Sequence, residues 1–333
     1  MIITKFIIGL ITHHVVNILL LKKKILLDDP DYSAHKKFVN NNKKVVLSGG
    51  LVFLLLFLFT PSASFNLKLF IFLIFFIGII SDLKILNLPA FRFLLQLIVV
   101  SSFVYLLDIG ISFTDLEYLD LILEYKFSSI FFSAFCILVL INGSNFFDGL
   151  NTLVIGYYIL VLSSLLALTK IFNIDYDLGL IINLILILFV ILIFNFLNKS
   201  FIGDSGAYSI SCLVGYICID FFKNIQDFSV LFIVVILWYP AFETLFSIIR
   251  KLQFKFNPTF PDNNHLHHHL FNFIHSKVKK FFLSNIFAAN LINIYNLIVF
   301  IIAIFNYKNS FFLSFILAIN ISVYMYLYNL LKK

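Results

Sequence analysis

Long apolar segments alternate with short polar stretches along the whole of this chain. A helix needs about 17–25 apolar residues to cross the roughly 30 Å of hydrocarbon in a bilayer, and most segments reach that length or come close. Because backbone groups cannot stay unpaired in lipid, each segment is predicted to be helical. The eleven segments are residues 2–21, 45–60, 67–81, 90–107, 128–142, 153–170, 178–197, 207–222, 229–249, 281–304 and 310–331. The pattern predicts an all-α, polytopic membrane protein with about eleven transmembrane helices in a single domain, residues 1–333.

The composition agrees with a membrane protein. Hydrophobic residues make up 61% of the chain and charged residues 12%, a balance that soluble domains do not have. Lysines follow the first segment instead of preceding it, which is the wrong order for a secretory signal and fits a transmembrane helix. The three cysteines lie in or beside apolar segments and are expected to be small hydrophobic residues, not a disulfide framework. The expected surroundings are a lipid bilayer, and no nucleic-acid partner is predicted.

The basic residues predict the orientation in the membrane. With residues 22–44 placed in the cytoplasm, 18 of the 24 Lys and Arg residues lie inside, as the positive-inside rule requires. Most of the acidic residues of the connecting loops then lie outside. The N-terminus is therefore predicted outside and the C-terminus in the cytoplasm. The predicted cytoplasmic loops are residues 22–44, 82–90, 142–152, 198–206 and 250–280.

An aspartate flanked by glycines stands in the fourth of these loops. Asp204 lies between Gly203 and Ser205-Gly206, with an apolar segment on each side. An acid there is costly unless it sits at an interface and has a partner, and the glycines let a ligand approach closely. For one such motif alone, a solvated loop acid is the alternative interpretation. The other polar loops on the same face favour a site.

The third and last loops add amides, an acid and histidines. Asn142, Asn145 and Asp148 are three residues apart, so a helix would place them on one face. Capping and helix–helix hydrogen bonds would explain one or two of them. Five of the eight histidines lie in the last loop, from His265 to His275. Such a cluster can bind zinc, and contact with a diphosphate is the other interpretation that remains open.

Few charged residues lie inside the apolar segments. Pro240 and Glu243 interrupt the ninth segment, and Glu243 shares a helix face with Arg250, so the two are predicted to pair near the interface. A transporter would be expected to carry polar residues near the middle of the bilayer, often with internal repeats. Carboxylates, amides, histidines and lysines gathered at one surface favour metal-assisted phosphoryl chemistry on a lipid instead.

Taken in order, the polar motifs resemble those of a known family. They are Asp28-x-Pro30, Gly49-Gly50, Gly78-x-x-x-Asp82, Asn142-x-x-Asn145-x-x-Asp148-Gly149-x-Asn151, Phe201-x-Gly203-Asp204-Ser205-Gly206, Pro240-x-x-Glu243-Thr244 and Asp262-x-x-His265-x-His267-His268. The chain is similar to the polyprenyl-phosphate N-acetylhexosamine-1-phosphate transferases (glycosyl transferase family 4), which include antigen-initiating GlcNAc-1-phosphate transferases and the phospho-MurNAc-pentapeptide translocase. The resemblance covers residues 28–269 and is closer to the antigen-initiating branch.

The resemblance implies a reaction and a location. A UDP-N-acetylhexosamine would donate its sugar 1-phosphate to undecaprenyl phosphate and release UMP, with Mg²⁺, or Mn²⁺, as the cofactor. This step would initiate a cell-surface polysaccharide such as lipopolysaccharide, at the cytoplasmic face of a bacterial inner membrane. The resemblance leaves open which N-acetylated hexose is transferred, and the oligomeric state is not predicted.

The resemblance also implies roles for individual residues. Asp204 and Asn145 match the metal ligands. The residues matched to catalytic positions are Asp82, Asp148, His267 and His268. The residues matched to substrate binding are Asn151 and Asn195, for the uridine, with Lys37, His265 and His269.

Two positions depart from the family pattern. Ser81 stands where the family has the first of two aspartates, and Asn263 stands where it has an arginine. The departure at Ser81 keeps one alternative open, a relative that binds the substrates without catalysis. A flippase or transporter for lipid-linked sugars is the other alternative, and it predicts no release of UMP.

Overall fold

The structure is a computed structural model that describes residues 2–28, 45–86, 88–114, 116–225, 228–255 and 264–332. Within these ranges the regular structure is helical. Two isolated β-bridges join Val46 to Leu27 and to Ser200. The helices are α1 (Ile2–Lys23), α2 (Gly49–Leu58), α3 (Phe65–Asp82), α4 (Pro89–Leu106), α5 (Glu117–Leu123), α6 (Lys126–Phe147), α7 (Leu153–Ile171), α8 (Gly179–Phe196), α9 (Gly203–Asn224), α10 (Val230–Ile236), α11 (Trp238–Gln253), α12 (Leu266–Val278), α13 (Phe281–Phe305) and α14 (Ser310–Leu331). The predicted all-α class is confirmed.

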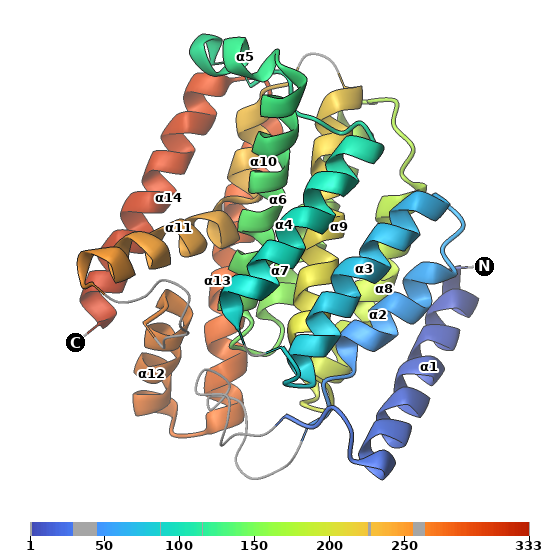
Figure 1. Cartoon of the computed structure of the whole chain (residues 1–333). Helices are drawn as coiled ribbons and strands as arrows, with labels where there is room; N and C mark the ends of the chain where they lie inside the picture. Colours follow the sequence, from blue (N-terminus) through green and yellow to red (C-terminus); the bar gives the residue numbers. More distant parts are fainter. Residues whose placement is uncertain are drawn as a thin grey trace.

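Every one of the predicted apolar segments contains a helix. In the described part of the chain, nine helices are long and apolar enough to cross a membrane: α1, α3, α4, α6, α7, α8, α9, α13 and α14. The ninth segment forms the bent pair α10–α11, which could count as one further span, and α2 is an apolar helix of only ten residues. The chain is a polytopic membrane protein, with its long helices side by side (Figure 1). Its predicted orientation in the bilayer stays a prediction.

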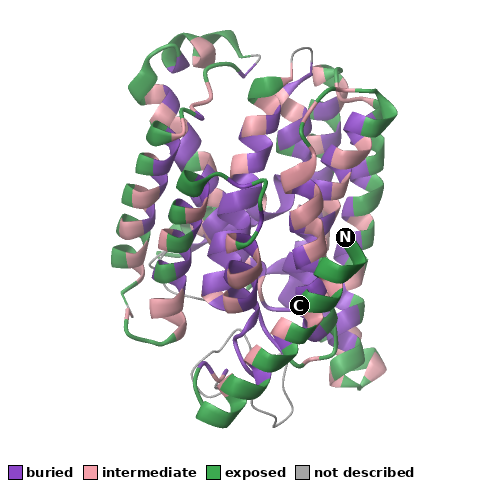
Figure 2. Cartoon of the chain, turned by 90° about the vertical axis from the view of Figure 1, so that its right-hand side faces the viewer, coloured by how far each residue is buried: buried purple, intermediate pink, exposed green. Residues whose placement is uncertain are grey.

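Helix α9 lies at the centre of the bundle. Of its most apolar stretch, 83% is buried inside the protein, and it packs against α3, α6 and α2. Small residues such as Gly206, Ser209 and Gly215 let neighbouring backbones approach closely, as is common where membrane helices meet. Figure 2 shows the buried residues along the middle of the molecule and exposed residues on the outward faces of the surrounding helices. The start of α9 is thereby held firmly by its neighbours.

The ninth segment is broken, as its polar residues suggested. Helices α10 and α11 meet at an angle of 73°. Pro240 lies in the first turn of α11, where proline does not remove a helical hydrogen bond. Helix α11 is amphipathic: most of its polar residues, including Glu243 and Arg250, are buried, whereas Leu252 and some other apolar residues are exposed. In Figure 1 it runs across the bundle toward the end of α14.

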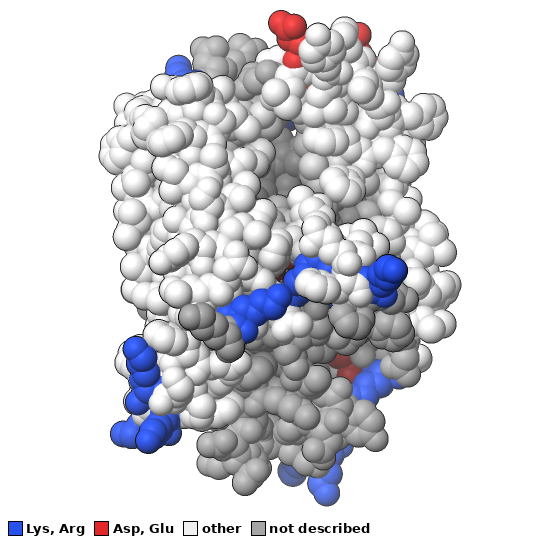
Figure 3. All heavy atoms as spheres, turned by 90° about the vertical axis from the view of Figure 1, so that its left-hand side faces the viewer, with Lys and Arg blue, Asp and Glu red and all other residues white. Residues whose placement is uncertain are grey.

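The histidine-rich stretch continues into a helix that the sequence did not predict. His265 precedes α12, which lies with the start of α13 at the lower end of the molecule in Figure 1. The end of α3, the end of α6 and the start of α9 lie at the same end of the molecule (Figure 1). The predicted polar loops next to these helix ends therefore lie together there. Figure 3 shows one side of the molecule, with most of the basic residues over its lower half and acidic residues both at its upper edge and, less prominently, lower down. This charge distribution agrees with the predicted orientation.

Candidate active site

Asp204 stands in the first turn of α9, where a bend of the chain turns it toward its neighbours. Gly203 has a φ of +68°, which favours glycine, and a Cβ there would lie 2.7 Å from Oδ2 of Asp82. The carboxylate of Asp82, at the end of α3, accepts hydrogen bonds from the backbone N–H of Asp204 (2.8 Å) and of Ser205 (3.0 Å). It also accepts one from the Ser205 hydroxyl at 2.6 Å. Asp82 therefore caps the start of α9 and fixes the backbone of Asp204.

Two more glycines bring other helices onto this turn. A Cβ on Gly50 would collide with the backbone of Gly206, and a Cβ on Gly78 would collide with that of Ser205. The motifs Gly49-Gly50 and Gly78-x-x-x-Asp82 thus share one physical reason, the close approach of α2 and α3 to the start of α9.

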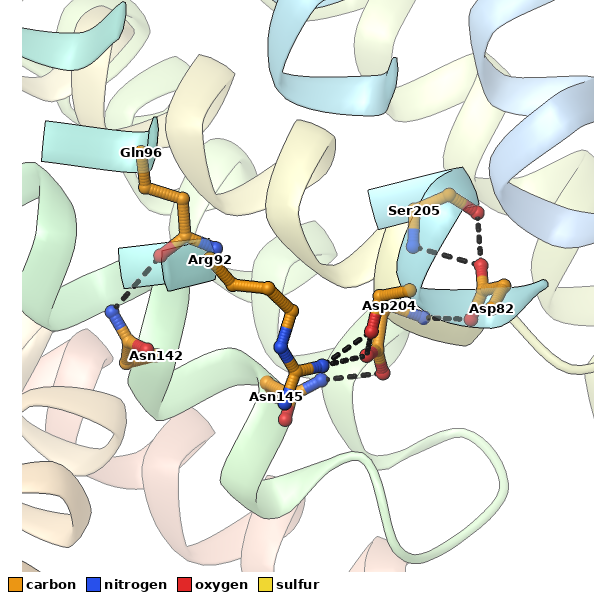
Figure 4. A network of polar contacts seen from close by, with 8 residues as sticks. Asp82, Arg92, Gln96, Asn142, Asn145, Asp204 and Ser205 are labelled. Carbon is orange, nitrogen blue, oxygen red and sulfur yellow. Dashed lines mark hydrogen bonds and ion pairs between the residues drawn. The ribbon is translucent and has the colours of Figure 1, made fainter. Parts of the chain in front are cut away.

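The carboxylate of Asp204 is surrounded by donors from three helices (Figure 4). Asn145 Nδ2, on the last turn of α6, donates to Oδ1 at 2.7 Å. Ser81 Oγ donates to Oδ2 at 2.6 Å, and Arg92 Nη1, from α4, lies 3.1 Å from the same oxygen. Arg92 also donates to Ser81 Oγ. The guanidinium and the N-terminal end of α9 both favour a negative charge on Asp204.

The donor set around Asp204 suits a hard cation. Asp204, Asn145 and Ser81 carry oxygens, which are the ligands that Mg²⁺ prefers, and Mg²⁺ commonly takes its remaining ligands from substrate phosphates and water. Within the described ranges, no group of three or more His, Cys, Asp or Glu side chains could hold a metal ion. A magnesium ion bound together with phosphates fits these residues better than a zinc ion held by the histidines.

His267 and His268 lie side by side next to the turn that follows α6. His267 and His268 are fully buried at the start of α12, and their ring centres lie 4.1 Å apart. A Cβ on Gly149 would lie 2.8 Å from Nε2 of both rings. The turn that carries Asp148 is therefore pressed onto the histidines, and only a glycine fits between them. Asp148 thus lies next to the residue that packs against His267 and His268, and its predicted catalytic role stays a prediction.

His265 has a buried acidic partner. Its Nδ1 lies 2.7 Å from Oε1 of Glu243, and both side chains are at most 4% exposed. Tyr324, on α14, donates to the other oxygen of Glu243 at 2.6 Å. This contact fixes the ring of His265, which in turn stacks on the ring of His267 at 5.5 Å. Glu243 and Tyr324 therefore hold His265, and through its ring they help to position His267.

Arg250 and His269 both contact Tyr328 of α14. The sequence predicted that Arg250 pairs with Glu243, but the structure gives Glu243 the partners His265 and Tyr324. Arg250 donates to the backbone carbonyl of Asn264 and, at 3.0 Å, to the hydroxyl of Tyr328. The ring of His269 packs edgewise against the ring of Tyr328. Burial, followed by the nearby charge of Arg250, lowers the pKa of His269, so its ring is expected to be neutral at pH 7.

Asparagines hold the turn between α6 and α7. Thr152 has a φ of +69°, and its N–H donates to Asn195 Oδ1 at 2.6 Å. Asn195 Nδ2 donates to the carbonyl of Ser200 at 3.0 Å. Asn151 donates from its side chain to Asn198, and its N–H donates to Asn285 of α13 at 2.9 Å. The side-chain oxygen and NH₂ group of Asn195 thus join two loops of the site, and both Asn151 and Asn195 are buried. Their predicted contact with the uridine stays a prediction.

Sequence reasoning missed several residues of the site. Arg92 was counted only among the basic residues, and Tyr324 of α14 was not considered. The asparagines of α13 were also missed, although polar residues inside an otherwise apolar segment are a signal of buried contacts. Lys37, predicted to bind substrate, lies outside the described residues.

Comparisons with known proteins point to one family. Residues 64–222 match the model of glycosyl transferase family 4. The matched region runs from the start of α3 almost to the end of α9, and it contains Ser81, Arg92, Asn145 and Asp204.

Three curated relatives carry similar names. The chain is 33% identical over 141 residues to the probable undecaprenyl-phosphate N-acetylglucosaminyl 1-phosphate transferase of Bacillus subtilis, covering 40% of this chain and 37% of the relative. It is 34% identical over 70 residues to the undecaprenyl-phosphate alpha-N-acetylglucosaminyl 1-phosphate transferase of Thermotoga maritima, 21% of this chain and 23% of the relative. It is 33% identical over 92 residues to the decaprenyl-phosphate N-acetylglucosaminephosphotransferase of Mycolicibacterium smegmatis, 23% of this chain and 22% of the relative. Each match thus spans well under half of the relative's length.

Proposed function

The chain belongs to glycosyl transferase family 4, and from this premise we propose that it is an enzyme that transfers a sugar 1-phosphate to a polyprenyl phosphate. The donor would be a UDP-N-acetylhexosamine, GlcNAc or a related sugar, and the acceptor undecaprenyl phosphate. The reaction releases UMP at the cytoplasmic face of a bacterial inner membrane and initiates a cell-surface polysaccharide. The names of the relatives support this class of donor and acceptor.

The observation that carries the proposal is the polar end of the bundle. Asp204, with Asn145 and Arg92 on its carboxylate, and the paired rings of His267 and His268 both adjoin the end of α6. The site therefore combines an oxygen set suited to Mg²⁺ with a guanidinium and imidazoles that can donate to phosphate oxygens. This combination suits a reaction between two phosphate groups, because it offsets their negative charge.

In the proposed reaction, an oxygen of the lipid phosphate attacks the phosphorus that carries the sugar. The bond from this phosphorus to the bridging oxygen breaks, and UMP leaves with that oxygen. A bound Mg²⁺, held by the Asp204 carboxylate and the Asn145 amide oxygen, would offset the charge of the phosphates. Arg92 adds a further positive charge, and His267 and His268 can donate N–H groups to the diphosphate. For such reactions positioning and charge neutralisation supply most of the acceleration.

The proposal is tested by release of UMP. Purified protein is incubated with undecaprenyl phosphate, Mg²⁺ and each of several UDP-N-acetylhexosamines, and UMP and the lipid product are measured. We expect UMP in amounts equal to the lipid-linked sugar. Transport of a lipid-linked sugar across vesicles without release of UMP would support a flippase instead.

Ser81 is expected to contribute little to turnover, although the family has an acid there. A phosphate monoester has its second pKa near ~6, so most of the lipid phosphate is already a dianion at pH 7 and needs no base. Ser81 Oγ lends Asp204 one hydrogen bond. Ser81→Ala should therefore lower kcat by no more than about tenfold, the value of one such bond. Ser81→Asp should bring no large gain. If wild-type protein were inactive and Ser81→Asp restored UMP release, the missing carboxylate would be shown to be needed.

A further inference from the structure

The side chain of Arg92 links α4 to the two polar residues in front of α9. Its Nη1 donates to Ser81 Oγ and lies 3.1 Å from Asp204 Oδ2, and in the described part of the chain Asp204 is its acidic partner. The pair is mostly shielded, with 23% of the Arg92 side chain and 20% of the Asp204 side chain exposed. Figure 4 shows Arg92 and Asn145 both pointing at the carboxylate of Asp204. Each carboxylate oxygen therefore already accepts from an N–H group.

A divalent cation needs the same oxygens that these donors contact. Oδ2 accepts from Arg92 and Ser81, and Oδ1 accepts from Asn145. A cation and a guanidinium cannot occupy the same side of one carboxylate oxygen, and two positive charges that close repel each other. The second nearby acid, Asp82, uses its oxygens to cap α9. A cation that binds Oδ2, or both oxygens of Asp204, must therefore displace the guanidinium of Arg92.

We propose that Arg92 is an internal counter-ion of Asp204 that competes with the divalent cation, so that the cation binds well only together with the donor's diphosphate. The diphosphate supplies further oxygen ligands for the cation and a new anionic partner for the displaced guanidinium. Ser81 matters because it is neutral: it holds Arg92 by a hydrogen bond and adds no charge that would help the cation. The inference rests on the proposed function and adds to it an order of binding.

Thermodynamic linkage makes this arrangement measurable. If the diphosphate tightens cation binding by some factor, the cation tightens diphosphate binding by the same factor. Removing Arg92 removes the competitor, so the cation should bind more tightly alone and gain less from the diphosphate. This pattern separates competition from a merely structural role, in which loss of Arg92 would weaken the binding of both.

The experiment measures Mn²⁺ binding by electron paramagnetic resonance on purified protein, without lipid substrate. Titrations are run with and without UDP, corrected for Mn²⁺ bound by free UDP. We expect Arg92→Gln to lower the Kd for Mn²⁺ alone by about tenfold, the scale of one charge-assisted contact. We expect UDP to tighten Mn²⁺ binding clearly in the wild type and much less in Arg92→Gln. Arg92→Lys keeps the charge and should behave as the wild type.

Two controls make the result specific. Lys277→Gln removes the same charge from an exposed position on α12 and should leave the Kd for Mn²⁺ unchanged. When Asp204→Asn is combined with Arg92→Gln, the tighter Mn²⁺ binding caused by Arg92→Gln should be lost. The inference is overturned if folded Arg92→Gln binds Mn²⁺ no more tightly than the wild type, or if the gain persists without Asp204. Absence of UMP release from the wild type would instead contradict the proposed function and would leave this Mn²⁺ result unchanged.

Discussion

Asp204→Asn should abolish turnover and leave the protein folded. The asparagine keeps the shape of the side chain and can still accept from Ser81, but it loses the negative charge that faces Arg92 and would hold the cation. A metal ion supplies several kcal/mol of charge stabilisation in the transition state. We therefore expect kcat to fall by at least about 10³-fold. The measurements are UMP release and the Kd for Mn²⁺.

A second acid on α9 offers the matched control. Asp220 lies at the opposite end of the helix, where it accepts a hydrogen bond from the hydroxyl of Tyr176 at 2.6 Å. Asp220→Asn makes the same chemical change in the same helix, and it should keep turnover within a few fold of the wild type. Retention of most activity by Asp204→Asn, with an unchanged Mg²⁺ requirement, would show that the cation binds elsewhere.

The fold was largely predictable because the membrane permits few alternatives. Each apolar segment became helical since unpaired backbone groups are too costly in lipid. Departures occur where polar residues enter the pattern. The ninth segment breaks before Pro240, and α11 turns its polar face inward. Helix α12 has only 13 residues, and histidines and other polar residues interrupt its apolar positions. The criterion of apolar length therefore did not identify it.

The site was predictable at the level of residue types, and its contacts were not. Spacing placed Asn142 and Asn145 on one helix face, and both lie on α6. Spacing also suggested that Glu243 pairs with Arg250, but its partners are His265, just before α12, and Tyr324 of α14. Such partners depend on how helices far apart in the sequence pack together, and local sequence patterns do not predict this packing. The contact between Arg92 and Asp204 was missed for the same reason.

Asp82→Asn should be the second most damaging change, through its effect on the start of α9. Both carboxylate oxygens of Asp82 accept from donors of Asp204 and Ser205. An asparagine would turn an NH₂ group toward one of these donors and leave it unpaired, which costs about 1–3 kcal/mol in a buried site. The backbone of Asp204 would then shift, and a displacement of about 1 Å can lower a rate by about 10²-fold. We expect a lower melting temperature, a fall of kcat of about that size, and weaker Mn²⁺ binding.

Ser205→Ala is the matched control, because it removes one hydrogen bond to Asp82 and keeps both backbone donors. It should lower kcat far less than Asp82→Asn. The pH dependence of the residual activity separates positioning from base catalysis. If Asp82 acts by holding α9, the acidic limb of the pH–rate profile in Asp82→Asn should stay where the wild type has it, because that limb then reports the lipid phosphate. A variant that melts and binds Mn²⁺ as the wild type does, yet releases no UMP, would show that the carboxylate acts directly on the substrate.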